Sequence, residues 1–206
     1  MSVAPAEPAL GGQVDGLSGS STGSRLHILG ASGSGTTTLG AALAARLGAA
    51  HHDTDDFFWL PTVPKFEAIR PRPERQALLG DALARHPAWV LTGSLCGWGD
   101  RFIPRFELVV FLWLAPEIRL ARLRERELQR YGDAGAPGGP RHAKLEAFLA
   151  WAAGYDEGLD VPERCLRLHE QWLAALPCPV LRITDAGEAG AHAETVVRAL
   201  AGRGIG

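Results

Sequence analysis

Gly30-Ala-Ser-Gly-Ser-Gly35-Thr36-Thr37 follows a short apolar segment, Arg25–Leu29, and precedes a segment whose leucines recur at helical spacing. It matches the phosphate-binding loop GxxxxGK[ST] at every fixed position except one, because Thr36 stands where that loop has lysine. The glycines let the backbone curl, so that successive N–H groups converge on a phosphate at the start of a helix. A Gly/Ser-rich connector that only permits a tight turn is the alternative, but the flanking strand and helix favour phosphate binding.

The loop is expected to hold phosphates through its backbone and its hydroxyl groups. The residues concerned are Gly30, Ser32, Gly33, Ser34, Gly35, Thr36, Thr37 and Thr38. The hydroxyl of Thr37 is also expected to bind Mg²⁺. The missing lysine normally bridges the β- and γ-phosphates and stabilises the charge during transfer. Thr36 offers a hydrogen bond but no charge, so another cation reaches the phosphates, or turnover is slow, or the protein binds without catalysing.

Predicted strands and helices alternate along the chain. Apolar runs predict strands at Arg25–Leu29, Ala49–Asp53, Trp89–Thr92, Leu108–Leu114 and Val180–Thr184. Helices are predicted at Thr37–Leu47, Pro73–His86, Pro116–Arg130, Lys144–Tyr155, Glu163–Leu176 and Ala191–Ala201. The alternation predicts a three-layer α/β domain, with helices on both faces of a five-stranded parallel sheet. Ligands of such sheets bind at the carboxyl ends of the strands, so the motifs are expected to gather at one edge.

Composition restricts the classes of partner. The chain has 206 residues, 46% hydrophobic and 21% charged, which is typical of one soluble globular domain. A net charge of −2 gives no field that attracts nucleic acid or anionic membranes. The longest apolar run, Leu108–Ala115, is too short to span a bilayer. The three cysteines are widely spaced and odd in number, which indicates a reducing compartment and hence the cytoplasm.

The first 24 residues differ from the remainder of the chain. They are mainly Gly, Ser, Ala and Pro, without Lys or Arg. Such a segment buries too little apolar surface to offset its ordering entropy, so residues 1–24 are predicted to be a disordered tail. They lack the basic start and apolar core of a secretory signal. The domain is expected to span residues 25–206.

An acidic segment, His51-His-Asp53-Thr-Asp55-Asp56, follows the second predicted strand. Together with the loop, it makes residues 25–202 similar to P-loop kinases of small metabolites, the adenylate kinase-like and shikimate- and gluconate-kinase-like proteins. The resemblance implies a Walker A loop without its lysine, strand order 2-3-1-4-5, and the use of ATP and Mg²⁺. It also implies an acceptor flap at about residues 54–87 and a lid at about residues 119–145.

The same resemblance assigns roles within the acidic segment. Asp53 would hold Mg²⁺ through water beside the substrate, and Asp55 would contact the acceptor hydroxyl as a catalytic residue. Without the resemblance, such a cluster is typical of a solvated turn or a helix cap, the role we expect of Asp56. His51 and His52 are adjacent on a strand and point to opposite faces, so they are expected to be structural.

Arginines follow the fourth predicted strand. The resemblance places phosphate-binding arginines on this helix and lid, and Arg126 and Arg130 are the leading candidates to replace the loop lysine in catalysis. Lys65 is held in reserve. The alternative is a solvated helix face on which Glu125 and Glu127 pair with neighbouring arginines.

Residues expected to bind the acceptor come from three segments. Gly93 ends the third predicted strand, and Arg70 and Arg101 lie in basic stretches before and after it. The Asp-x-Asp pair favours a hydroxylated acceptor, because a carboxylate repels an incoming phosphate. The arginines favour a nucleoside monophosphate instead; they are Arg70, Arg72, Arg101 and Arg105. The aromatic stretch Phe57–Trp59 either stacks on the acceptor or packs within the flap.

The sequence thus predicts a phosphotransferase that moves the γ-phosphate of ATP to a small acceptor, a nucleoside monophosphate or a hydroxylated metabolite. Catalysis would rest on positioning and electrostatics. The alternative, motivated by Thr36, is a nucleotide-binding regulatory protein with weak or no turnover. The expected partners are ATP and the acceptor, without nucleic acid or membrane, and the expected state is a monomer or a homodimer.

Overall fold

The glycine-rich segment joins a strand to a helix. In the computed structural model, which describes residues 24–158 and 164–202, strand β1 (Arg25–Gly30) ends at the first glycine. Helix α1 (Thr36–Leu47) begins directly after Gly35. The loop therefore has the strand and helix that its spacing requires on either side.

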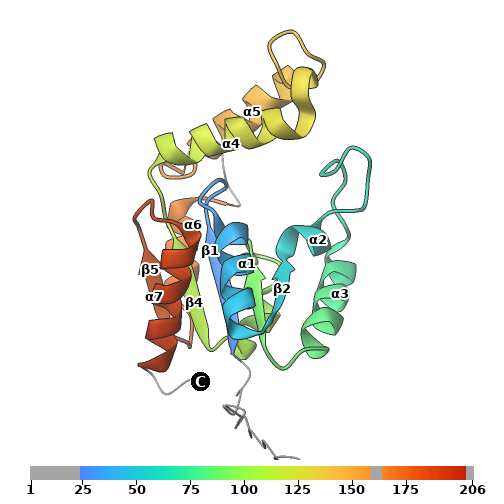
Figure 1. The fold of residues 1–206 in the computed structure, drawn as a ribbon. Coiled ribbons are helices and arrows are strands. Elements are labelled where there is room, and N and C mark those ends of the chain that lie inside the picture. Colours follow the sequence, from blue (N-terminus) through green and yellow to red (C-terminus); the bar gives the residue numbers. More distant parts are fainter. Residues whose placement is uncertain (1–23, 159–163, 203–206) are drawn as a thin grey trace, which may run out of the picture.

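The sheet confirms the predicted topology. Its other strands are β2 (Ala50–Asp53), β3 (Trp89–Thr92), β4 (Leu108–Leu112) and β5 (Val180–Ile183). All neighbours are parallel, in the order β2-β3-β1-β4-β5. The central strands are apolar on both faces because both faces are covered, as Figure 1 shows.

Helices cover both faces of the sheet. On one face α1 and α7 (Ala189–Ala201) pack over a core that includes Leu26, Ile28, Leu43 and Val196. On the other face lie α3 (Arg72–Ala84), the 3₁₀ turn η1 (Asp100–Arg105) and α6 (Leu166–Ala174). Large side chains, among them Trp89 and Phe111, fill this second core. The two buried layers hold the strand ends in fixed positions.

Beyond the carboxyl edge of the sheet, α4 (Pro116–Tyr131) and α5 (His142–Ala153) form a helical hairpin that carries the expected lid (Figure 1). The hairpin has a small apolar core of its own, centred on Leu123 and Leu149. Arg119 anchors it: the buried guanidinium donates to the carbonyl oxygens of Leu114 (3.0 Å) and Ala152 (3.3 Å). This arginine of the predicted cluster is therefore structural.

Several elements differ from the sequence predictions. Helix α2 (Thr54–Phe58) and the turns η1 and η2 (Gly132–Ala134) were not predicted, because one turn is too short to show helical periodicity. The cap of α2 is Asp53 rather than Asp56, since Asp53 Oδ1 accepts the N–H of Asp55 at 3.0 Å. The helix predicted at Glu163–Leu176 corresponds to α6, which begins at Leu166. The predicted first residue, Glu163, lies outside the described residues.

The predicted tail, residues 1–24, lies outside the described residues except for Ser24. Ser24 is buried, and its carbonyl oxygen accepts the N–H of Trp89 at 3.0 Å. This residue therefore belongs to the domain. Within the part of the chain that the structure describes, no helix is both long and apolar enough to cross a membrane.

Candidate functional site

A cleft of about 1530 Å³ lies at the carboxyl edge of the sheet, below the lid hairpin. Most of the predicted site residues line it: Gly30, Ser32, Gly33, Ser34, Gly35, Thr36, Thr37, Thr38, Asp53, Asp55, Arg70, Gly93, Arg126 and Arg130. Arg101 does not line it; this guanidinium lies over the ring of Phe102, 5.8 Å from the ring centre. The parallel topology explains the gathering, because every strand ends at this edge.

The glycine loop has a shape that only glycine permits. Gly33 and Gly35 have φ angles of 83° and 98°, in the left-handed region. A Cβ on Gly33 would lie 2.6 Å from the carbonyl oxygen of Arg119, so the loop backbone packs directly on the first turn of α4. The loop is thereby fixed between the sheet and the base of the lid.

The loop also leaves polar groups free for a ligand. The N-cap of α1 is Gly35, which has no side chain to cap the helix, so within the described residues the first N–H groups of α1 have no side-chain cap from this position and are suited to an anion. The hydroxyl of Ser34 is buried and has no hydrogen-bond partner within residues 24–158 and 164–202. These features fit a bound phosphate, whose oxygens accept hydrogen bonds.

The two predicted magnesium ligands meet across the loop. Thr37 Oγ1 donates to Asp53 Oδ2 at 2.7 Å, and Thr92 Oγ1 donates to the same carboxylate oxygen at 3.1 Å. Among the described residues there is no cluster of three or more His, Cys, Asp or Glu suited to a metal. A hydroxyl and one carboxylate suit Mg²⁺, which takes most of its remaining ligands from phosphates and water.

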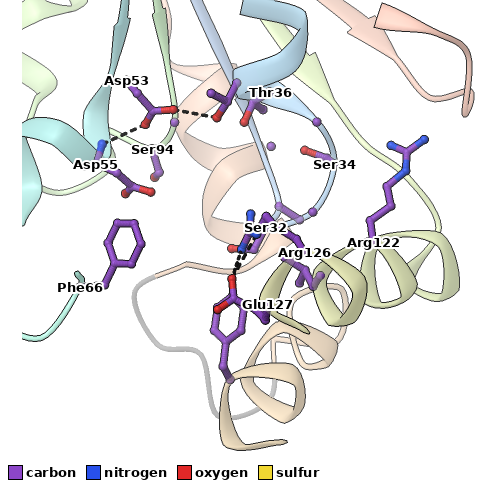
Figure 2. A pocket seen from close by; sticks show the side chains of 18 of the residues that line it. Ser32, Ser34, Thr36, Asp53, Asp55, Phe66, Ser94, Arg122, Arg126 and Glu127 are labelled. Atoms are coloured by element: carbon purple, nitrogen blue, oxygen red, sulfur yellow. Dashed lines mark hydrogen bonds and ion pairs between the residues drawn. The ribbon is translucent and has the colours of Figure 1, made fainter. Parts of the chain in front are cut away.

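Asp55 lies on the wall of the cleft that α2 provides (Figure 2). Desolvation by the surrounding walls raises the pKa of this carboxyl, and the charge of Asp53 raises it further. The positive charges of Arg164 and Arg126 act in the opposite direction on the same pKa. The carboxylate is therefore a better proton acceptor than a solvated aspartate and faces cations across the cleft.

The lid contributes an arginine pair held by one carboxylate. Arg126 donates to Glu127 Oε1 from Nε (3.1 Å) and Nη2 (3.0 Å), and Arg130 Nη1 donates to the same oxygen at 3.0 Å. All three residues line the cleft, and Figure 2 shows Arg126 and Glu127 on the side opposite Asp53 and Asp55. The predicted cations therefore lie at the site, and the salt bridges of the alternative interpretation are present as well.

Two predicted acceptor ligands have structural contacts. The guanidinium of Arg70 donates to the carbonyl oxygens of Phe57 (3.0 Å) and Trp59 (3.1 Å), which ties the two ends of the flap loop together. Gly93 has a φ of 100°, and a Cβ there would lie 1.9 Å from Thr54 Oγ1. Gly93 therefore serves the close approach of β3 to α2.

The histidines of β2 are structural, as their adjacency predicts. His51 Nε2 lies 3.2 Å from Thr92 Oγ1 on the side of α1, where Gly40 leaves room for the ring. The ring of His52 contacts Phe57 and His86 on the other side. Burial lowers the pKa of both.

Sequence reasoning missed several residues of the cleft. Phe66 adds to the aromatic walls formed by Phe58 and Trp59, and Arg164 adds a positive charge. Trp98, which the sequence suggested could close the acceptor pocket, lines the cleft as well. Phe66 has a φ of 68°, which is rare for a side chain of this size. A lone arginine or aromatic in a loop has no periodic pattern, so only the fold could place them at the site.

Comparison with known proteins identifies a relative of this chain. The chain is 51% identical over 161 residues to "Uncharacterized protein YqaC" of Bacillus subtilis (strain 168), covering 78% of this chain and 88% of that protein. No model of a protein family matches.

Two solved structures share the fold. Shikimate kinase from Acinetobacter baumannii in complex with shikimate superposes with a TM-score of 0.52 at 19% identity, covering 90% of this chain and 97% of that one. Shikimate kinase from Bacteroides thetaiotaomicron superposes with a TM-score of 0.51 at 19% identity, covering 86% of this chain and 98% of that one. The chain therefore has the fold of small-molecule P-loop kinases.

Proposed function

Because this chain belongs to the family of Bacillus subtilis YqaC and has the small-molecule kinase fold, we propose that it transfers the γ-phosphate of ATP to a small hydroxylated acceptor. The observation that carries the proposal is the placement of Asp55 in the same cleft as the glycine loop and the Thr37–Asp53 pair. A phosphate site, a pair of hard oxygen ligands and a basic carboxylate are the parts that phosphoryl transfer requires.

The chain's own residues account for the reaction. The loop and the start of α1 hold the phosphates, while Thr37 and Asp53 would hold Mg²⁺, which neutralises and orients phosphate oxygens when bound. Asp55 accepts the proton of the acceptor hydroxyl as its oxygen bonds to the γ-phosphorus. The bond from that phosphorus to the bridging oxygen breaks, and ADP leaves with the electron pair.

The arginine pair of the lid supplies the charge that Thr36 lacks. Arg126 and Arg130 line the cleft on the lid side, while the loop lies on the sheet side. An arginine acting on the transferring group is worth roughly 10³–10⁵ in rate in related chemistry. The pair therefore stands in for the lysine from the opposite side of the phosphates.

The acceptor end favours a hydroxylated metabolite over a nucleoside monophosphate. Of the arginines that favoured a phosphorylated acceptor, Arg70 is committed to backbone carbonyls, and the other three do not line the cleft; these are Arg72, Arg101 and Arg105. The walls are aromatic, with Trp59 and Phe66 in edge-to-face contact at 5.9 Å. Such walls suit the apolar face of a ring that also carries hydroxyl groups.

A screen of ATP consumption tests this function. The full chain is incubated with MgATP and sets of hydroxy acids, sugars, cyclitols, nucleosides and nucleoside monophosphates, and ADP release is followed. We expect release with a hydroxylated ring compound, and loss of that release in Asp55→Asn. Release only with nucleoside monophosphates would overturn the acceptor class.

A nucleotide-binding regulatory protein without turnover is the second candidate, and Thr36 favours it. It requires ATP binding without ADP release for any acceptor. Calorimetric binding of MgATP combined with a negative screen would select this candidate over the kinase.

A further inference from the structure

Glu127 is more enclosed than the two arginines with which it pairs on the lid side of the cleft. Only 12% of this side chain is exposed, against 47% for Arg126 and 36% for Arg130. A single oxygen, Oε1, accepts all three guanidinium hydrogen bonds. The carboxylate thus joins the two arginines, and all three residues line the cleft.

The three residues together carry a net charge of +1, which equals the charge of the lysine that Thr36 replaces. Two arginines alone would carry twice that charge and would repel each other on adjacent turns of α4. The shared carboxylate removes this repulsion and fixes the orientation of both guanidinium groups.

Stability alone does not explain the carboxylate. Both arginines of these ion pairs are exposed to solvent, which screens the pairing and reduces its contribution to folding. A negative charge on the wall of a phosphate site also opposes the ligand. The carboxylate is useful at this position only if fixing the orientation of the arginines contributes more to the reaction than its repulsion of the phosphates costs.

The arginines so held lie near residues of the acceptor side of the cleft. The charge of Arg126 reaches Asp55 across the cleft. Arg130 lies over the ring of Phe66, 5.2 Å from the ring centre, and so meets the acceptor flap. The pair therefore lines the same cleft as the glycine loop and lies near the residues expected to meet the acceptor.

We propose that Glu127 is a positioning residue, which holds Arg126 and Arg130 in the orientation that stabilises the transferring phosphoryl group at the expense of some ATP affinity. This inference rests on the proposed kinase function. The proposed role of Glu127 affects binding of the transition state more than binding of ATP, because only the transition state requires the two arginines to be aligned.

The test compares two ligands on the full chain by calorimetry. MgATP reports binding of the ground state, and MgADP with aluminium fluoride mimics the transferring phosphoryl group. Glu127→Gln removes the charge, whereas Glu127→Asp keeps the charge but shortens its reach. Glu125→Gln is the matched control, since it removes one charge from the same helix at a residue that pairs with Gln129 and does not line the cleft.

In Glu127→Gln we expect MgATP to bind several-fold more tightly, because a repulsive charge is gone. The gain in affinity that aluminium fluoride gives to MgADP should fall about tenfold, because the arginines are no longer aligned. Glu127→Asp should lose the same gain without tighter MgATP binding. Glu125→Gln should match the wild type in both measurements.

Other outcomes separate the two proposals. A wild-type chain that binds no MgATP contradicts the proposed function before any variant is compared. Retention of the aluminium fluoride gain in Glu127→Gln or in Glu127→Asp overturns the role of Glu127 alone, as does an equal weakening of both ligands. A wild type that binds MgATP but gains nothing from aluminium fluoride overturns the inference and favours the regulatory candidate.

Discussion

At the scale of single residues, the phosphate loop depends on backbone conformation more than on side chains. Gly33 and Gly35 both adopt left-handed conformations, but only Gly33 is also closed in by a neighbouring carbonyl. The nearest atom to a Cβ on Gly35 would be Arg122 Nη1 at 3.7 Å, which leaves room for a methyl group. Gly35 therefore allows the conformation of the loop to be tested without a steric clash.

Gly35→Ala should abolish the rise in melting temperature that ATP produces. An alanine at a φ of 98° is strained by about 1–3 kcal/mol, and the loop can release this strain by leaving the phosphate-binding conformation. Gly48→Ala is the control, because Gly48 has a φ of 60° at the end of α1 and no atom within 4 Å of its Cβ. It should lower stability but keep the ATP shift, and a full shift in Gly35→Ala would refute the loop assignment.

Asp53→Asn and Asp55→Asn should separate in their effects. Asparagine also caps helices, so Asp53→Asn should still fold, but it should need more Mg²⁺ for the same rate. Asp55→Asn should lower kcat and kcat/KM alike, because the proton acceptor is used only as the hydroxyl attacks. Magnesium titrations and acceptor kinetics measure both effects, and wild-type kinetics in the two variants would return both residues to a surface turn.

The pH profile gives a second measurement of the same pair. Asp55 must be ionised to accept a proton, so activity falls as the pH drops through the raised pKa of this group. The charge of Asp53 contributes to that rise, so the acidic limb of kcat/KM should move to lower pH in Asp53→Asn. An unmoved limb would show that Asp55 is not the group observed.

At the scale of elements, α4 has two functions. Its first turn is held to the connection after β4 and to the end of α5 by the buried Arg119, and its last turns present Arg126 and Arg130 to the cleft. A helix that is fixed at one end positions side chains further along more precisely than a loop does. The lid also meets the acceptor flap, where Glu67 pairs with Lys144 at 2.7 Å and with Arg141 at 3.2 Å.

Arg126→Ala should reduce turnover by at least about a hundredfold, with a much smaller loss of ATP affinity. Arg126→Lys should restore little, because an ammonium group cannot form the same paired hydrogen bonds. Arg124→Ala is the matched control, since this side chain pairs with Glu146 at 2.7 Å and does not line the cleft. Single-turnover kinetics measure the rate and calorimetry the affinity.

Thr36→Lys in the Arg126→Ala background should recover much of the lost rate, because the two cations act on the same phosphates. A large gain in turnover from Thr36→Lys alone, together with wild-type turnover in Arg126→Ala, would contradict this view. The protein would then be a nucleotide sensor.

At the scale of the whole molecule, two buried histidines connect the fold to pH. His27 lies within the central strand, where its Nδ1–H donates to the carbonyl oxygen of Leu91, 3.0 Å away, while Phe106 stacks on its ring. His169 lies between Tyr155 (2.8 Å) and Ser94 (3.4 Å). Burial lowers the pKa of His27 from 6.5 to about 3 and that of His169 from 6.5 to about 4.

The free energy of unfolding should therefore decrease as the pH falls below about 6.5. Unfolded histidines bind protons in this range and folded ones do not, which costs about 2 kcal/mol per histidine at pH 5. Urea unfolding at pH 7 and pH 5 measures the difference. His169→Gln should remove the contribution of that histidine, about 2 kcal/mol, whereas replacement of the exposed His86 should not, and an equal loss in both variants would contradict the assignment.

The sequence alone determined the elements whose cause is local. The glycine spacing of the loop, the apolar runs of the strands and the order of strands and helices follow from short stretches of chain, so the fold class was predictable. The site was predictable where a local motif or the resemblance to small-molecule kinases assigned a residue, as for Thr37 in the glycine loop and Asp53 in the acidic segment.

Only the tertiary structure decided which charges reach the cleft. Nothing in the sequence distinguished Arg70, Arg101 and Arg126 as candidate ligands. In the structure, Arg70 donates to backbone carbonyl oxygens and Arg101 does not line the cleft. Arg126 lines the cleft and shares the carboxylate of Glu127 with Arg130. A long charged side chain can choose among many partners, and its choice depends on the packing of segments far apart in the chain. Loop geometry is set by neighbours along the backbone, whereas electrostatic partners are set by distance in space.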